Sequence, residues 1–181
     1  MVIKKWKHLK TEDIISLKIF NILEKIYQHP DTKREFRANI LDTPDWVNIV
    51  GVNSENKILL IRQFRFGTET IELEIPGGIK GENETPKDAA LRELREETGY
   101  RVERIEKAGC VHANPAFMNN KCYTFVATLS EEKGKTDFDP NEIIETEFAT
   151  ISQVKEYLKE VQINNAYCVL GLFWYLFSEQ F

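Results

Sequence analysis

GIKGENETPKDAALRELREETGY, residues 78–100, begins as a glycine-containing loop and continues as a helix. Thr85 is a hydroxyl N-cap and Pro86 suits the first helical position, while Gly99 suits the left-handed residue that ends a helix. The stretch carries five glutamates within sixteen residues: Glu82, Glu84, Glu93, Glu96 and Glu97. Such a density of acid on a loop and helix needs a physical explanation.

The acidic and the apolar side chains of this helix are expected on different faces. Ala90 and Leu94 are four residues apart and are expected to face inward together. Glu93 and Glu97 have the same spacing on a different face, with Glu96 beside them. Such like-charged pairs cost roughly 0.2–0.5 kcal/mol each in water, and more in an enclosed site unless a cation lies between them. Carboxylate oxygens suit Mg²⁺ or Mn²⁺ rather than zinc, so the pattern predicts a site for one of these ions.

The spacing of the whole stretch resembles the Nudix box. That pattern is glycine, five residues, glutamate, seven residues, then Arg-Glu-aliphatic-any-Glu-Glu-any-Gly-aliphatic. Tyr100, an aromatic residue in the last aliphatic position, is the one departure. The alternative is a solvated, charge-rich surface helix, which would have no need of the preceding glycines or of Glu84. The matching residues are Gly78, Glu84, Arg92, Glu93, Leu94, Glu96, Glu97 and Gly99.

The resemblance is to the ADP-ribose pyrophosphatase branch of this family, and it implies roles for several residues. It implies metal ligation by Glu93, Glu97 and the Gly77 carbonyl, with Glu96 as a further ligand or a neighbour of the ligands. It also implies a catalytic glutamate on a loop well after the box, for which Glu142 is the candidate and Glu145 stands behind it. An acidic surface loop without a catalytic role is the alternative for these two residues.

Other positions select the substrate class by resemblance. Arg65, in a strand that also carries Arg62, would reach a substrate phosphate. Pro115 lies sixteen positions after Gly99, the spacing typical of hydrolases of ADP-ribose and related nucleotide sugars. Asn120 stands where those hydrolases commonly have glutamate, which extends the expected substrates to conjugates such as GDP-mannose. The remaining candidate substrate contacts are Trp46 and Phe117, which could stack on a base, and Arg34, which with Trp46 could act across a dimer interface.

Composition limits the partners and the compartment. The 181 residues are 42% hydrophobic with a net charge of −5 and no basic run, so nucleic acid is not an expected partner. Three cysteines without CxxC spacing favour a reducing cytoplasm. The longest apolar run, residues 166–177, is too short to span a membrane and is interpreted as a buried helix.

Periodicity predicts strands before the box and helices at the end of the chain. Residues 11–28 fit either a strand or a helix, and the turn-forming HPDTK at 29–33 favours a hairpin with 34–41. Further strands are expected at 46–52, 58–64, 69–75, 102–111, 123–129 and 143–151, the one at 69–75 having one polar face. Ser152 and Asn164 are expected to begin the last two helices.

The expected class is α+β, an α/β/α sandwich with a mixed sheet between helices, as the Nudix resemblance also implies. Residues 1–45 are expected to form an N-terminal β-hairpin extension that dimerises, and 46–181 the catalytic domain of a homodimer. The expected activity is metal-dependent hydrolysis of nucleoside diphosphate sugars to a nucleoside monophosphate and a sugar phosphate. A nucleoside triphosphate sanitising hydrolase and a nucleotide-sugar sensor without turnover are the alternatives.

Overall fold

The computed structural model describes residues 2–138 and 143–178, and the chain divides into two compact units. One unit combines Met1–Asp45 with His112–Lys121, and the other combines Trp46–Val111 with Cys122–Phe181. The short segment 112–121, which was expected to belong with the catalytic domain, thus clusters with the N-terminal residues. Each unit is described by itself.

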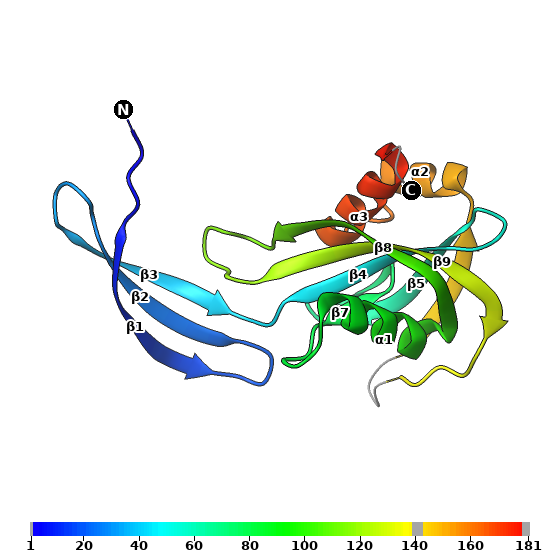
Figure 1. Ribbon diagram of the computed structural model, residues 1–181, viewed down its shortest axis with the longest axis horizontal. Helices are drawn as coiled ribbons and strands as arrows, with labels where there is room; N and C mark the ends of the chain where they lie inside the picture. Colours follow the sequence, from blue (N-terminus) through cyan, green and yellow to red (C-terminus); the bar gives the residue numbers. More distant parts are fainter. Residues whose placement is uncertain (1, 139–142, 179–181) are drawn as a thin grey trace. The chain divides into compact units, whose positions relative to one another are not determined.

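The first unit contains a three-stranded antiparallel sheet of β1 (Lys7–Ser16), β2 (Asn21–Gln28) and β3 (Glu35–Asp42), in that order (Figure 1). The turn predicted after residue 28 is present, and the imidazole of His29 accepts hydrogen bonds from two backbone N–H groups within it. A second reversal, which the sequence did not reveal, separates β1 from β2, where Leu17 N donates to Phe20 O at 3.0 Å. The ambiguous residues 11–28 therefore form two strands rather than one strand or a helix.

The second unit is built on a seven-stranded mixed sheet. Five strands follow the order β10 (Ile144–Ala149), β5 (Ile58–Arg65), β4 (Trp46–Val52), β9 (Lys121–Lys133) and β8 (Tyr100–His112). Strands β4 and β9 are parallel, whereas β5 pairs antiparallel with β10 and, only at Val52 and Ile58, with β4. Beyond that point β5 pairs with β6 (Thr70–Glu74) and β4 pairs with β7 (Gly77–Ile79). The glycine-containing loop expected from residue 78 thus begins as a short strand, in which Gly77 and Gly78 pair with Asn48 and Val47.

Helices cover both faces of this sheet, as the sandwich prediction required. On one face, α1 (Pro86–Thr98) buries Ala90 and Leu94 against Val47 and Ile49 of β4. On the other face, α2 (Ile151–Lys159) and α3 (Ala166–Phe177) pack on alternate residues of the same strand, including Val50. Because successive strand residues point to opposite faces, β4 supplies apolar side chains to both cores.

The helix ends show which local signals were sufficient. The Thr85 hydroxyl accepts from Asp88 N, and Gly99 ends α1 with φ 76° while donating to Arg95 O, as predicted. The predicted start of α2 at Ser152 is wrong, because Thr150 and Gln153 form a reciprocal capping box two residues earlier. The last helix begins after Asn165, whose side chain accepts from Tyr167 N, rather than after Asn164.

Strand β6 differs from its expected polar face. Glu72 and Glu74 are both buried, whereas Ile71 is exposed. Glu72 accepts hydrogen bonds from the hydroxyls of Thr68 and Thr70, and Glu74 is surrounded by polar partners described below. None of the helices in the described residues is long and apolar enough to cross a membrane.

Candidate active site

Two carboxylates of α1 meet the two glycines of β7. Glu97, with 3% of its surface exposed, accepts a hydrogen bond from Gly77 N at 3.0 Å. A Cβ placed on Gly78 would lie 2.5–2.6 Å from the carboxyl atoms of Glu93, so any side chain there would displace that carboxylate. Glu93 and Glu97 are one helical turn apart and therefore face the same stretch of backbone. This is the central geometry of the site.

Arg92 lies among the remaining acids of the box. Its guanidinium donates to Glu84 at 2.7 and 3.0 Å, to Glu93 at 2.8 Å and to Glu96 at 3.0 Å. A further hydrogen bond to Ile79 O, at 3.0 Å, ties the helix to the end of β7. Arg92 therefore braces Glu96 on the helix and also contacts two other carboxylates.

Glu84 holds the loop between β7 and α1. It accepts from Arg92 and, at 2.9 Å, from Gly81 N, and these hydrogen bonds lower the pKa of its carboxyl from 4.5 to about 2. Lys80 reinforces the same loop, since its ammonium donates to the carbonyls of Gly81 at 2.7 Å and Glu84 at 3.1 Å. The loop is thus fixed by two cations and one ionised acid.

The donor set fits a hard divalent cation. Glu93, Glu96 and Glu97 offer only carboxylate oxygens, and the backbone of Gly77 and Gly78 lies against two of them. Among residues 2–138 and 143–178, no three His, Cys, Asp or Glu side chains are grouped closely enough to hold a metal by themselves. The Gly77 carbonyl remains an expected ligand beside these carboxylates.

Arg65 lies at the end of β5 and is paired with an acid that the sequence analysis did not single out. Its Nε is 3.2 Å from both oxygens of Glu74, and its Nη2 is 2.5 Å from Oε2. Burial lowers the pKa of Arg65, but the hydrogen bonds and charge of Glu74, together with the charge of Glu97, raise it overall. Arg65 therefore stays cationic within electrostatic reach of the Glu97 carboxylate.

Three candidate residues lie on the other face of the sheet. Arg62 and Glu145 are opposite each other in the β5–β10 ladder, and Arg62 alternates with residues that face α1. Arg62 pairs instead with Glu147, at 3.2 Å. Trp46 is on the same side of β4 as Asn48, and its ring packs edge-on against Tyr167 of α3, with centroids 5.2 Å apart. The structure does not bring these side chains together with Glu93 and Glu97.

The first unit contains three more of the candidates. Arg34 and Phe117 are exposed there. Asn120 is buried and donates from Nδ2 to Pro44 O at 3.1 Å, so its amide ties the segment before β9 to the segment before β4. Glu142, the candidate general base, lies outside the described residues.

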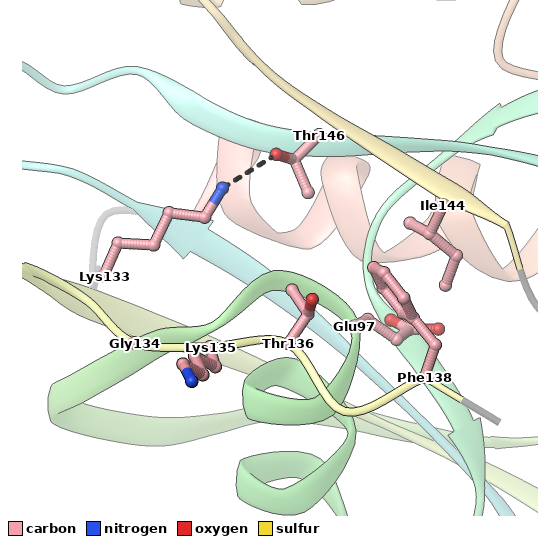
Figure 2. A pocket seen from close by; sticks show the side chains of 8 residues that line it. All are labelled: Glu97, Lys133, Gly134, Lys135, Thr136, Phe138, Ile144 and Thr146. Atoms are coloured by element: carbon pink, nitrogen blue, oxygen red, sulfur yellow. Dashed lines mark hydrogen bonds between the residues drawn. The ribbon is translucent and has the colours of Figure 1, made fainter.

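A cavity of about 500 Å³ opens beside Glu97 (Figure 2). The segment that follows β9 forms one wall and is tied to the end of α1, since Gly134 N donates to Gly99 O and Asp137 N donates to Glu96 O. Lys133 extends to Thr146 of β10, with its Nζ 3.3 Å from the hydroxyl oxygen. The lining residues are Glu97, Lys133, Gly134, Lys135, Thr136, Phe138, Ile144 and Thr146.

Sequence reasoning missed Lys133, Thr146 and Glu74. The first two are ordinary strand residues, and only the pairing of β10 with β5 brings Thr146 towards the cavity. Glu74 did carry a signal, because an acid three residues before Gly77 ends a strand that leads directly into the site. The alternating pattern of that strand predicted a polar face, but not that this face is buried.

Comparison with known proteins gives a family, several relatives and a fold. The NUDIX domain model matches residues 43–169. A methanol dehydrogenase activator of Bacillus methanolicus is 30% identical over 92% of this chain and 90% of its own length. An ADP-ribose pyrophosphatase of Bacillus subtilis is 30% identical over 88% of this chain and 86% of its own length. A solved structure of an ADP compounds hydrolase superposes with a TM-score of 0.85 over 97% of this chain and 95% of its own, at 22% identity, and so supports the fold.

Proposed function

Because the chain belongs to the NUDIX domain family, we propose that it is a metal-dependent pyrophosphatase that acts on ADP-ribose and related nucleoside diphosphate sugars. The products are a nucleoside monophosphate and a sugar phosphate. Relatives in Bacillus subtilis and Saccharomyces cerevisiae are ADP-ribose pyrophosphatases, which supports this substrate class. A GDP-mannose pyrophosphatase of Cronobacter sakazakii, 27% identical over 75% of this chain, supports the inclusion of GDP-mannose.

The observation that carries the proposal is the meeting of Glu93 and Glu97 with the Gly77-Gly78 backbone. Two carboxylates one turn apart would repel each other in a buried setting, and Glu97 is almost fully buried. A surface helix would have no reason to press them against glycines that admit no side chain. A divalent cation between them removes the repulsion.

Nudix hydrolases generally use divalent metal ions, and we assign Mg²⁺ or Mn²⁺ to Glu93, Glu97, the Gly77 carbonyl and Glu96. When bound, the ion would neutralise phosphate oxygens and polarise the pyrophosphate linkage. Arg92 pairs with Glu93 and Glu96 and orients their carboxylates, and Glu84 with Lys80 keeps the loop in place.

Arg65 is the proposed contact of this chain with the substrate phosphates. Its guanidinium lies at the end of β5, close enough to Glu97 for their charges to interact. Glu142 remains the predicted general base. Arg62 and Glu145 are left out of the proposed centre, because the sheet separates them from α1. Trp46 remains a prediction for stacking on the base. Phe117, Asn120 and Arg34 remain predictions for binding the nucleoside or the sugar.

The test is phosphate release, coupled to a phosphatase, across a nucleotide panel with Mg²⁺ or Mn²⁺ and again with EDTA. The panel holds ADP-ribose, GDP-mannose, UDP-glucose, a dinucleotide and nucleoside triphosphates. We expect metal-dependent cleavage of ADP-ribose and at least one other sugar conjugate. Turnover of triphosphates alone would establish the sanitising activity instead, and protection from thermal unfolding without turnover would favour a sensor.

A second candidate function follows from the relative that activates methanol dehydrogenase, which is as similar to this chain as the pyrophosphatase. The same preparation should be added to a methanol dehydrogenase assay, with and without the metal. Stimulation that survives in a variant unable to cleave ADP-ribose would separate the two activities.

We also propose that the protein is a cytoplasmic homodimer and that its first unit forms the interface. The large apolar side chains exposed on that unit support this assembly. They include Ile14, Ile15, Leu17, Ile19 and Phe36.

A further inference from the structure

Glu74 is a buried carboxylate with an unusual set of partners. It is 2% exposed and accepts three close N–H contacts from Arg65, whose side chain is 41% exposed. Burying a carboxylate carries a desolvation penalty of several kcal/mol, so a buried ion pair is weak support for stability alone. A role in orienting Arg65 accounts for why the acid is kept at this position.

The geometry leaves one edge of the Arg65 guanidinium available. Nε and Nη2 face Glu74, whereas Nη1 makes no hydrogen bond to any residue in the described part of the chain. A guanidinium is planar, so fixing one edge on a carboxylate also fixes the direction of the other. Pre-orienting a long side chain reduces the entropy lost when it binds a ligand.

Asn165 holds Glu74 from a second element. Its Nδ2 donates to Glu74 Oε1 at 3.0 Å, while its Oδ1 accepts from Tyr167 N at 3.0 Å and caps α3. Both ends of this amide are therefore used, and Glu74 cannot rotate without losing a contact to the helix. The acid is fixed from β5 on one side and from α3 on the other.

The network is continuous with the centre described above. Glu74 is the last residue of β6, and three residues later Gly77 N donates to Glu97. The chain between them crosses from the β5–β6 ladder to the β4–β7 ladder. Arg65 and the Glu93–Glu97 pair are thus joined by one short, buried segment.

We propose that Glu74, held by Asn165, is a positioning residue that aims the free edge of Arg65 at the pyrophosphate of the substrate. This inference rests on the proposed function and adds two residues to it. Glu74 itself touches no substrate, because Arg65 and Asn165 occupy its oxygens. Its effect must therefore pass through Arg65.

The experiment is a double-mutant cycle on ADP-ribose hydrolysis with E74Q, R65Q and the combined variant. We expect E74Q to raise KM about tenfold with kcat changed less than about threefold, since the phosphate charge is present before the reaction. In the R65Q background, E74Q should change KM less than about twofold. Equal effects of E74Q in both backgrounds, or an unchanged KM, would overturn the inference.

Two further variants separate positioning from folding. N165S keeps a side-chain oxygen to cap α3 but removes the donor to Glu74. We expect it to raise KM about threefold in the wild-type background and to leave KM unchanged in the R65Q background. If E74Q does not fold, this second cycle decides the matter alone. E72Q is the matched control, because Glu72 is a buried glutamate of the same strand whose hydrogen bonds go to threonine hydroxyls and not to Arg65. Its charge acts on Arg65 without orienting the guanidinium, so the KM of E72Q should rise less than about twofold.

Failure of the proposed function would be visible separately. If the wild type does not turn over any conjugate, the same cycle is run on the Kd of ADP-ribose, measured by calorimetry. The Kd should then rise by the same factors as those expected for KM. A wild type that neither cleaves nor binds ADP-ribose would overturn both statements. If the wild type cleaves ADP-ribose but the effects of E74Q and R65Q on KM are additive, only the role of Glu74 is overturned.

Discussion

A single arginine, Arg92, explains how the acids of the box are tolerated so close together. It contacts three carboxylates and one carbonyl, and the pKa of its guanidinium is raised, chiefly by its hydrogen bonds with Glu84. The sequence gives these residues a spacing, but only the folded loop brings Glu84 back to Arg92, eight positions later. One cationic side chain therefore offsets the negative charge of three neighbouring glutamates.

Glu84→Gln is expected to destabilise the fold in a pH-dependent way. The folded carboxyl has a pKa of about 2 against 4.5 for the free group, so its stabilising effect is present above pH 4.5. That effect is lost as the pH falls from 4.5 through about 2. Urea unfolding at several pH values should show a difference between wild type and variant at pH 7 that shrinks towards pH 2. A difference independent of pH would show that the charge of Glu84 is not involved.

Glu97→Gln is expected to keep the fold and to lose at least about 100-fold in kcat, because a carboxylate that we propose as a metal ligand becomes neutral. The amide oxygen can still accept from Gly77 N, so circular dichroism and the Tm should change little. Glu82→Gln changes an exposed glutamate of the same box and serves as the control, with activity within about twofold of the wild type. A normal rate for Glu97→Gln at low Mg²⁺ would remove Glu97 from the site.

At the scale of elements, helix α1 is the best-specified part of the chain. Its N-cap, first-turn proline and left-handed C-cap all lie where the local sequence placed them. The other two helices were predicted with their starts displaced, because neighbouring residues competed for the capping role. Strand β7 was missed altogether, since three residues containing two glycines form a strand only when β4 lies beside them.

Gly99→Ala is expected to destabilise the protein by about 1–3 kcal/mol. The residue has φ 76°, and an added Cβ would lie 2.5 Å from Gly134 O, in the segment that lines the cavity. Gly67→Ala is the matched control, because a Cβ there meets nothing within 4 Å. Denaturant unfolding of both variants measures the difference, and an equal effect at the two glycines would contradict the assignment of strain to Gly99.

At the scale of the whole molecule, the two units present different surfaces. Strand β1 is exposed along nearly all of its length, and several large apolar residues of the first unit lie on the surface. An isolated small sheet of this kind gains little from its own burial. A second copy of the chain is the partner that we propose for it.

Light scattering of the purified protein should therefore give twice the chain mass of 21.1 kDa. Changing Ile15 and Phe36 together to lysine should halve that mass, because a charge at an apolar interface is strongly unfavourable. Phe173→Lys alters an equally exposed apolar residue of the second unit and should leave the mass unchanged. A monomeric wild type would refute the dimer.

The sequence by itself determined the Nudix family, the α/β/α class and the boundaries of α1, because these depend on short-range spacing and on local capping. It also placed Glu93 and Glu97 on one helical face. Tertiary structure alone decided which strand residues share that side of the sheet. It put Arg62 and Glu145 on the far face, and it buried Glu74 as the partner of Arg65. It also brought Asn165 to Glu74 from 91 positions away. The physical reason is that strand alternation fixes two faces without saying which is which, and that choice depends on the elements that pack on each.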